Sequence, residues 1–448
     1  MRLAPLALAL LFVLPAAALA APPAVAPAAS VAPAAAASAA APAAAGPSLA
    51  DIQTFTRVFE LVRQAYVDKV DDHTLMQSAI TGMLAGLDPH SEFLTRKGLD
   101  QLDEDTSGRY GGLGIEVAQV NGELRVIAPI DGTPAARAGM LPGDVIVGIN
   151  GKAVDPDALN VALDQLRGAP GTRITLSVLH PQAARPVDLT LTRERIQIAS
   201  VRSRLLQPGY AYLRISQFQD DTVAELTRQI EALQKKDGPL QGAVLDLRSN
   251  PGGLVTAAVG VADDFLDHGT IVSTRGRLKQ ADMTFTAQGG GDLLKGAPLV
   301  VLVDNGTASA AEIVAGALKD NHRAVLMGRR TFGKGSVQTV LPLPGGEAVK
   351  LTTARYYTPD GGSIQARGIE PDIRLADATV KLDQGPQLTQ READLPNHLA
   401  GDKPAGSAEG GEGKLAGDDY WLSEALHVVQ GLAVARAATA AQPATRNR

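Results

Sequence analysis

The sequence predicts an α/β protein of several domains, and three observations support this. Its 448 residues exceed what a single hydrophobic core usually organises. Residues 243–247 and 298–303 are continuously apolar, and each run leads through a turn into a helical pattern, as in parallel sheets that are covered on both faces. Residues 108–196 instead contain several short strands and a single helix. The chain therefore combines an α/β core with a smaller, strand-rich domain.

Residues 1–20 predict a secretory signal peptide. A basic residue precedes an apolar run that ends in Ala18-Leu19-Ala20, a small-x-small cleavage pattern. Two prolines leave the run short of the ~20 apolar residues that a membrane span requires, so a retained membrane anchor is the less favoured alternative. Residues 21–47 are almost entirely Ala and Pro, have no large side chains to bury, and predict a linker. We therefore expect an exported protein. The sequence contains no cysteine, which excludes disulfides and a thiol nucleophile.

Residues 48–107 predict a helical region. Ser48 is a suitable N-cap, and apolar residues then recur twice at helical spacing. The two sets are Ile52, Phe55, Phe59, Val62 and Tyr66, and then Met76, Ile80, Met83 and Leu87. Their apolar faces need a partner, which is either the body of the protein or another subunit, and the sequence favours neither.

Residues 108–196 resemble a PDZ domain. Asn121-Gly122 between alternating apolar residues predicts a hairpin, and one helix is expected at residues 158–166. The loop GGLGI and the downstream segment AGMLPGD carry the resemblance. In that family such a loop offers amides to the terminal carboxylate of a peptide, which adds a strand to the sheet edge. The resemblance assigns this role to Gly112, Leu113, Gly114 and Ile115; the alternative is that the glycines only shape a turn.

The α/β core contains two glycine- or serine-rich turns that we expect to be neighbours. The turn Asn250-Pro251-Gly252-Gly253 follows the strand at 243–247, and Asp304 to Ser309 follow the strand at 298–303. Helices are expected after both turns, at 254–265 and from Ser309 through Leu318. If the strands are parallel neighbours, both turns lie at the carboxyl edge of the sheet, where α/β proteins usually place their sites.

Ser309 has two interpretations. Ser309-Ala310-Ala311-Glu312 spells a capping box, which favours a structural role. The same position, at a helix N-terminus with free amides, also suits a serine nucleophile, and bare amides of the neighbouring glycine turn could stabilise an oxyanion.

Lys334 also has two interpretations, because the stretch GRRTFGKGSVQ (328–338) partly matches a phosphate loop. That motif requires Ser or Thr directly after the lysine and a following helix, whereas Gly335 occupies the position and a β-branched run follows. A lysine can instead act as the base for a serine, provided that burial brings its pKa well below ~10.4. Gln338, four residues on, would share a face with Lys334 on a strand and accept a hydrogen bond from its amine.

Six ordered blocks make the chain resemble the carboxy-terminal processing proteases. They are DPHSEFL (88–94), the PDZ-like block, VLDLRSNPGGL (244–254), NGTASAAEIVAGALKDN (305–321), GRRTFGKGSVQ and TARYYTPDGGSIQARGIEPDI (353–373). The resemblance implies a crotonase-like protease core of repeated β-β-α units over residues 197–382. It also implies a Ser-Lys-Gln site of Ser309, Lys334 and Gln338, with oxyanion donors at Ala310 and at Gly253 or Gly252. Thr307 and Ala311 stand where many members have serines, which removes two rival nucleophiles.

The resemblance further implies a periplasmic serine endopeptidase, with READLPNHL (391–399) similar to the tail of Gram-negative members. Substrates would be proteins with apolar C-terminal tails, a helical-repeat adaptor lipoprotein could deliver them, and a homo-oligomer is expected. No cofactor or metal is implied, since no two histidines stand at ligand spacing, and no basic stripe indicates nucleic acid. Residues 383–448 should comprise a flexible segment, most of it between 384 and 417, and a C-terminal helix.

Two other classes compete with the protease. A catalytically silent PDZ-containing binding protein would retain the loop without the protease site, and a crotonase-type acyl-CoA enzyme would lack the Ser-Lys pair.

Overall fold

A computed structural model describes residues 46–378, 399 and 412–440, and they fall into two compact units that divide between Leu75 and Met76. Each unit is described by itself. The predicted signal peptide and nearly all of the predicted linker lie outside the described residues, as does almost all of the tail segment READLPNHL.

The N-terminal helices have the predicted positions. Helix α1 (Leu49–Ala65) begins after Ser48, whose hydroxyl accepts a hydrogen bond from the N–H of Asp51, while the Asp51 carboxylate accepts one from the N–H of Ser48. Helix α2 (Asp72–Ala85) follows. No residue of α1 is buried. Its apolar face is therefore exposed and consists of Leu49, Ile52, Phe55, Val58, Leu61 and Val62.

A twelve-residue helix leads into the strand-rich domain, whose hairpin and expected helix are both confirmed; a short helix at Pro134–Arg137 was not predicted. Asn121 and Gly122 have φ values of 53° and 79°, as a two-residue hairpin turn requires, and join β3 to β4. The elements in chain order are α3 (Arg96–Ser107), β2 (Arg109–Gly112), β3 (Ile115–Val120), β4 (Glu123–Pro129), α4 (Pro134–Arg137), β5 (Val145–Ile149), β6 (Lys152–Ala153), a 3₁₀ turn (Pro156–Ala158), α5 (Leu159–Leu166), β7 (Arg173–Leu179), β8 (Val187–Thr192) and β9 (Glu194–Gln197).

The α/β core is built on a six-stranded sheet of order β10-β11-β12-β15-β16-β19, in which every pair except β10-β11 is parallel. Its strands are β10 (Val201–Gln207), β11 (Tyr210–Ile215), β12 (Gly242–Asp246), β15 (Leu299–Val303), β16 (Val325–Gly328) and β19 (Ile373–Arg374). Strands β12 and β15 are adjacent and parallel, which confirms that the two turns lie at one edge of the sheet.

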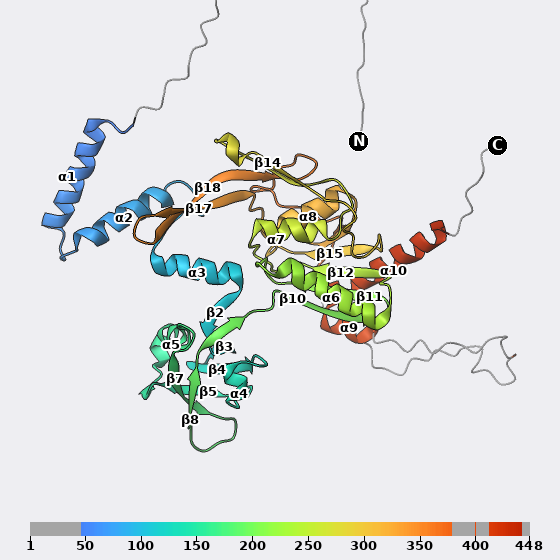
Figure 1. Cartoon of the computed structure of the whole chain (residues 1–448), viewed down its shortest axis with the longest axis horizontal. Coiled ribbons are helices and arrows are strands. Elements are labelled where there is room, and N and C mark those ends of the chain that lie inside the picture. Colours follow the sequence, from blue (N-terminus) through green and yellow to red (C-terminus); the bar gives the residue numbers. More distant parts are fainter. Residues whose placement is uncertain (1–45, 379–398, 400–411, 441–448) are drawn as a thin grey trace, which may run out of the picture. The chain divides into compact units, whose positions relative to one another are not determined.

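Helices cover both faces of this sheet, as its continuously apolar strands predict (Figure 1). On one face, Leu245 and Val301 pack with α6 (Thr222–Asp237), α7 (Val255–Asp263) and α8 (Ala310–Asp320). On the other face, Val244 and Val300 pack with α10 (Tyr420–Ala440). The C-terminal helix therefore docks on the core.

A second sheet stands beside the core and has the order β1-β18-β13-β14, with β17 paired to β18. Its strands are β1 (Glu92–Leu94), β13 (Thr270–Gly276), β14 (Met283–Thr286), β17 (Ser336–Leu343) and β18 (Glu347–Tyr357), with a 3₁₀ turn at Lys279–Ala281. The β-branched run after Lys334 is thus a strand, as predicted, and no helix follows the lysine.

Within the described residues, part of the segment that was expected to be flexible is instead ordered, because Glu412–Asp418 form helix α9. Asp419, directly after it, accepts two hydrogen bonds from the Arg248 guanidinium, which also holds Asp246 at the end of β12. These ion pairs fix the junction of α9 and α10 to the core.

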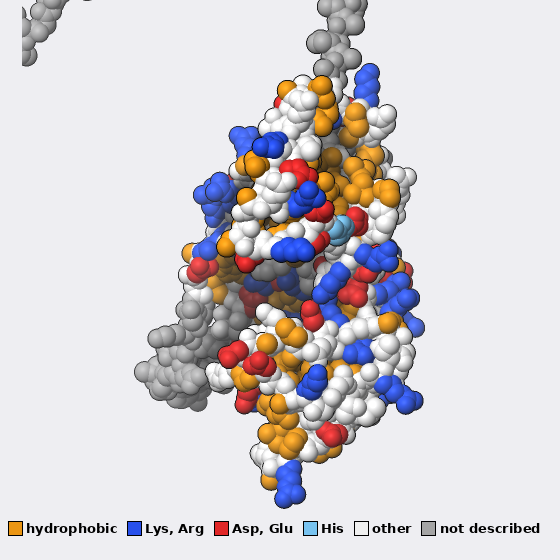
Figure 2. All heavy atoms as spheres, turned by 90° about the vertical axis from the view of Figure 1, so that its left-hand side faces the viewer, with side chains coloured by type: hydrophobic (Ala, Val, Ile, Leu, Met, Phe, Trp, Pro, Cys, Tyr) orange, Lys and Arg blue, Asp and Glu red, His pale blue; other side chains and the backbone are white. Residues whose placement is uncertain are grey.

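Among the helices of the described residues, none is long and apolar enough to cross a membrane. Acidic and basic side chains are intermixed over the face that Figure 2 shows, in keeping with the small net charge of the chain.

Candidate functional site

Ser309 occupies a strained position at the N-terminus of α8. Its φ of 55° and ψ of −116° lie outside the regions that residues with a side chain prefer, and it is 8% exposed. The preceding turn is held in place by Thr307, whose hydroxyl donates to the carbonyl of Leu247 at 2.8 Å. The arrangement presents a serine hydroxyl at a strand-to-helix turn, which is typical of nucleophile elbows.

The turn Asn250–Gly253 lies against Ser309, as expected from the parallel strands. A Cβ atom on Gly252 would come within 2.8 Å of Ser309 Cβ, so only glycine allows this approach. The N–H of Gly252 donates to Asn250 Oδ1 at 2.9 Å and is therefore engaged. The N–H of Gly253 donates to no acceptor in the described part of the chain, and Ala310, the first residue of α8, has no intrahelical acceptor for its own N–H. Gly253 and Ala310 thus offer free amides, whereas Gly252 does not.

Glu312 joins Ser309 to Lys334. Its Oε2 accepts hydrogen bonds from the backbone N–H of Ser309 at 2.9 Å and of Lys334 at 2.8 Å. Its Oε1 accepts from the Thr331 hydroxyl at 2.5 Å and from the N–H of Gly333 at 2.8 Å. The side chain is fully buried, and burial raises the pKa of the carboxyl group above its usual value despite these bonds. The sequence suggested only a capping box here and gave no sign of the contacts with residues 331–334.

The loop that carries Lys334 is held by a distant segment. A Cβ on Gly335 would lie 2.3 Å from the backbone nitrogen of Gln365, and the N–H of Gly335 donates to Gln365 Oε1 at 3.0 Å. Glycine replaces the Ser or Thr of a phosphate loop because another backbone passes at this point.

Lys334 is half-buried, and burial lowers the pKa of its amine below the usual lysine value. Lys350 lowers that pKa further, whereas the carboxylates of Asp88 and Glu92 raise it. The net direction favours a neutral amine, which a base requires. Within residues 46–378, no hydrogen bond joins Lys334 Nζ to Ser309 Oγ or to Gln338.

Gln338 lies in β17 next to a bulge that shifts the register between Val337 and itself. Lys334 precedes this strand, so the simple alternation of faces used for prediction does not apply to the pair. Gln338 Nε2 donates to Ser336 Oγ at 3.0 Å and to Thr352 Oγ1 at 3.2 Å. The role of Gln338 toward Lys334 stays a prediction.

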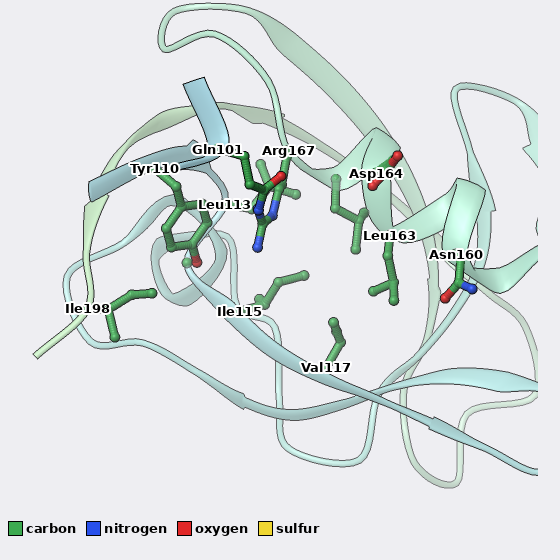
Figure 3. A pocket seen from close by; sticks show the side chains of 12 residues that line it. Gln101, Tyr110, Leu113, Ile115, Val117, Asn160, Leu163, Asp164, Arg167 and Ile198 are labelled. Carbon is green, nitrogen blue, oxygen red and sulfur yellow. The ribbon is translucent and has the colours of Figure 1, made fainter. Parts of the chain in front are cut away.

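The strand-rich domain contains a groove of about 520 Å³ between β3 and α5 (Figure 3). Leu113, Gly114 and Ile115 line it, whereas Gly112 is buried in β2. The other apolar lining residues are Val117, Leu163, Leu166 and Ile198, and the polar ones are Gln101, Tyr110, Asn160, Asp164 and Arg167. Its mixed apolar and polar lining beside the sheet-edge strand β3 suits an extended peptide.

The fold and the site together define a serine hydrolase with an α/β core and a PDZ domain. Comparison with known proteins makes this specific: the sequence model of "Peptidase family S41" matches residues 209–375, that of the "PDZ domain" matches 125–179, and that of the "Activating protease CtpB N-terminal domain" matches 25–98. The chain belongs to the carboxy-terminal processing serine proteases of peptidase family S41.

Two curated relatives support this assignment. A carboxy-terminal-processing protease of Bartonella bacilliformis is 43% identical over 382 residues, which are 84% of this chain and 88% of the relative. The carboxy-terminal processing protease CtpA of Bacillus subtilis is 36% identical over 319 residues, 71% of this chain and 67% of the relative. Among solved structures, a photosystem II D1 C-terminal processing protease is 34% identical with a TM-score of 0.43, over 72% of this chain and 92% of that one.

We predict that Glu312→Gln destabilises the fold. The substitution retains the size of the side chain, but it replaces one carboxylate oxygen by an NH₂ group, which faces two of the four donors that surround residue 312. Each donor left unpaired should lower the stability of the fold by about 1–3 kcal/mol. The free energy of unfolding in urea should fall accordingly. Glu231→Gln, at an exposed position of α6, is the control; equal unfolding free energies for the two variants would contradict the structural role of Glu312.

Proposed function

We propose that the chain is an exported serine endopeptidase that recognises C-terminal tails through its PDZ domain and cuts peptide bonds with Ser309, Lys334 and Gln338. One observation carries the proposal: the backbones of Ser309 and Lys334 share a single oxygen of Glu312, beside the free amides of Gly253 and Ala310. A nucleophile, a lysine with lowered pKa and oxyanion donors then occupy one edge of the sheet.

The reaction proceeds by acyl transfer. Ser309 Oγ attacks the carbonyl carbon of the scissile bond, and neutral Lys334 Nζ takes the hydroxyl proton. The N–H groups of Gly253 and Ala310 stabilise the oxyanion. The protonated lysine gives its proton to the leaving amine, and water then hydrolyses the acyl-enzyme with the lysine again as base. Gln338 orients the amine through its amide oxygen.

The apolar side chains that line part of the PDZ groove support a preference for apolar tails. Leu113, Ile115 and Leu163 would bury the last side chains of the substrate, while the strand β3 pairs with its backbone. An acidic tail would place carboxylates against these three apolar side chains at a desolvation cost.

We predict that only the wild-type protein cleaves an unfolded test protein with an apolar C-terminal tail. Ser309→Ala removes the nucleophile and Lys334→Ala the base, so both variants should lose at least ~10³-fold in kcat/KM. Cleavage is followed by electrophoresis and mass spectrometry, and the same protein with an acidic tail should be cut more slowly.

Two results would count against this assignment. Cleavage by Lys334→Ala at the wild-type rate would remove the lysine from the mechanism. An inert wild-type protein that still binds the apolar tail would favour the alternative, a silent PDZ-containing binding protein.

We propose that the protein acts in the periplasm and that a helical-repeat lipoprotein delivers substrates there. The signal-like sequence of residues 1–20 supports the first statement, and family resemblance supports the second. Affinity purification from the periplasmic fraction should yield a chain that begins at Ala21, together with such a lipoprotein. An uncleaved N-terminus would indicate a retained anchor, and a chain purified without the lipoprotein would remove it from the proposal.

The exposed face of α1 supports a homo-oligomer. Ile52 and Phe55 are each about half exposed, an unusual state for large apolar side chains on one helix face. We predict that the double variant Ile52→Asp/Phe55→Asp lowers the sedimentation coefficient to that of a monomer. Gln53→Asp/Thr56→Asp adds the same charge to the same helix and should retain the oligomer; dissociation by both pairs would refute a specific interface.

A further inference from the structure

A turn that precedes β1 reaches the candidate site from far away in the sequence. Asp88 closes this turn: its Oδ1 accepts from the N–H of His90 at 2.9 Å and of Ser91 at 3.1 Å, and its Oδ2 from the Ser91 hydroxyl at 2.7 Å. The turn is attached to β18, because the N–H of Thr352 donates to Ser91 Oγ at 3.1 Å and the Thr352 hydroxyl lies 3.1 Å from Asp88 Oδ1. The turn belongs to the block DPHSEFL (88–94), which contributed to the family resemblance but for which the sequence predicted no role.

The Thr352 hydroxyl connects this turn to Gln338. It accepts a hydrogen bond from Gln338 Nε2 at 3.2 Å, and Ser336 Oγ accepts a second one from the same nitrogen at 3.0 Å. Gln338 Oε1 accepts no hydrogen bond from the residues that the structure describes. The amide nitrogen is therefore held on two sides, and the amide oxygen is available.

The charge of Asp88 determines the direction of this chain of hydrogen bonds. Burial raises the pKa of the Asp88 carboxyl group, but the bonds from Ser91, His90 and Thr352 outweigh it and hold that pKa below its usual value, so the group is ionised and can only accept. The single hydroxyl proton of Thr352 must then point to Asp88, and its lone pair faces Gln338. A reversed amide would place Gln338 Oε1 against that lone pair.

We propose that Asp88 and Thr352 are positioning residues that fix the side-chain amide of Gln338 so that its oxygen, and not its NH₂ group, serves Lys334. The inference rests on the proposed roles of Lys334 and Gln338 and deepens them. Neither Asp88 nor Thr352 needs to touch the substrate.

The pH dependence of activity can test the inference, because the charged groups around Lys334 influence the pKa of its amine. Asp88 in the turn and Glu92 in β1 stabilise the protonated amine, whereas Lys350 in β18 and burial oppose it. Burial lowers the pKa of His90 and the charges of Lys334 and Lys350 lower it further, whereas the charge of Asp88 raises it. An amide oxygen that accepts from the ammonium also favours the protonated form. Loss of that acceptor therefore lets Lys334 lose its proton at a lower pH.

The test compares Thr352→Val with Thr352→Ser and Thr353→Val. Valine removes the hydroxyl at nearly constant volume, and serine restores it. Thr353 is the matched control, since its hydroxyl pairs with that of Thr339 at 2.7 Å on the opposite face of the same strands. Thr352→Val should lower kcat about tenfold, which is less than the factor of 10²–10⁴ that a positioned base contributes. It should leave KM unchanged and shift the acid limb of the pH profile of kcat/KM to lower pH. Thr352→Ser and Thr353→Val should resemble the wild-type protein.

A second variant keeps the inference testable if Thr352→Val fails to fold. Asp88→Ala removes the oxygen that receives the Thr352 hydroxyl proton, so the hydroxyl can reverse, and it removes a charge near Lys334; the acid limb should again move to lower pH with a reduced kcat. A wild-type kcat and pH profile in the folded variants, or equal losses in Thr352→Val and Thr353→Val, would overturn the inference. Failure of the proposed function is distinct, because wild type and Ser309→Ala would then both be inactive.

Discussion

The candidate site depends on one buried carboxylate. Glu312 is fully enclosed, and a charge in that position is expensive unless donors surround it. Four donors do so, and they come from two segments: the N-terminus of α8 and residues 331–334 of the following loop. Because the three donors of residues 331–334 would lose this acceptor if the loop moved away, the carboxylate holds the loop that carries Lys334 against the turn that carries Ser309.

The order of the sheet makes this arrangement possible. Strands β12, β15 and β16 are parallel neighbours, so the glycine turn, Ser309 and the loop after Gly328 all leave the same edge. Helices on both faces leave little freedom to these strand ends. Gly252 and Gly335 then permit approaches between backbones that any Cβ would obstruct. The positions of the reactive groups follow from this layering more than from any local motif.

Local sequence patterns predicted many of the helices, strands and turns that build this fold. Apolar runs predicted β12 and β15, helical spacing predicted α1 and α8, and Asn121-Gly122 predicted a hairpin, because each signal lies within a few residues. The contacts of Glu312 with Thr331 and of Asp88 with Thr352 join residues that are 19 and 264 positions apart, and no periodicity reports them. The alternation of faces does not apply to Lys334 and Gln338, because Lys334 lies in the loop before β17 and a bulge follows Val337. The engaged N–H of Gly252 likewise depends on the rotamer of Asn250.

The stretch 328–338 illustrates how a partial motif is decided by distant residues. Its glycines and lysine are spaced like those of a phosphate loop. In a phosphate loop and in this loop alike, glycine allows another group to come close to the backbone. A phosphate loop directs free amides toward an anion that comes from solution. Here the N–H groups of Gly333 and Lys334 already bind the carboxylate of Glu312, and that of Gly335 binds Gln365. The protein supplies the anion itself, and the lysine side chain is left for other chemistry.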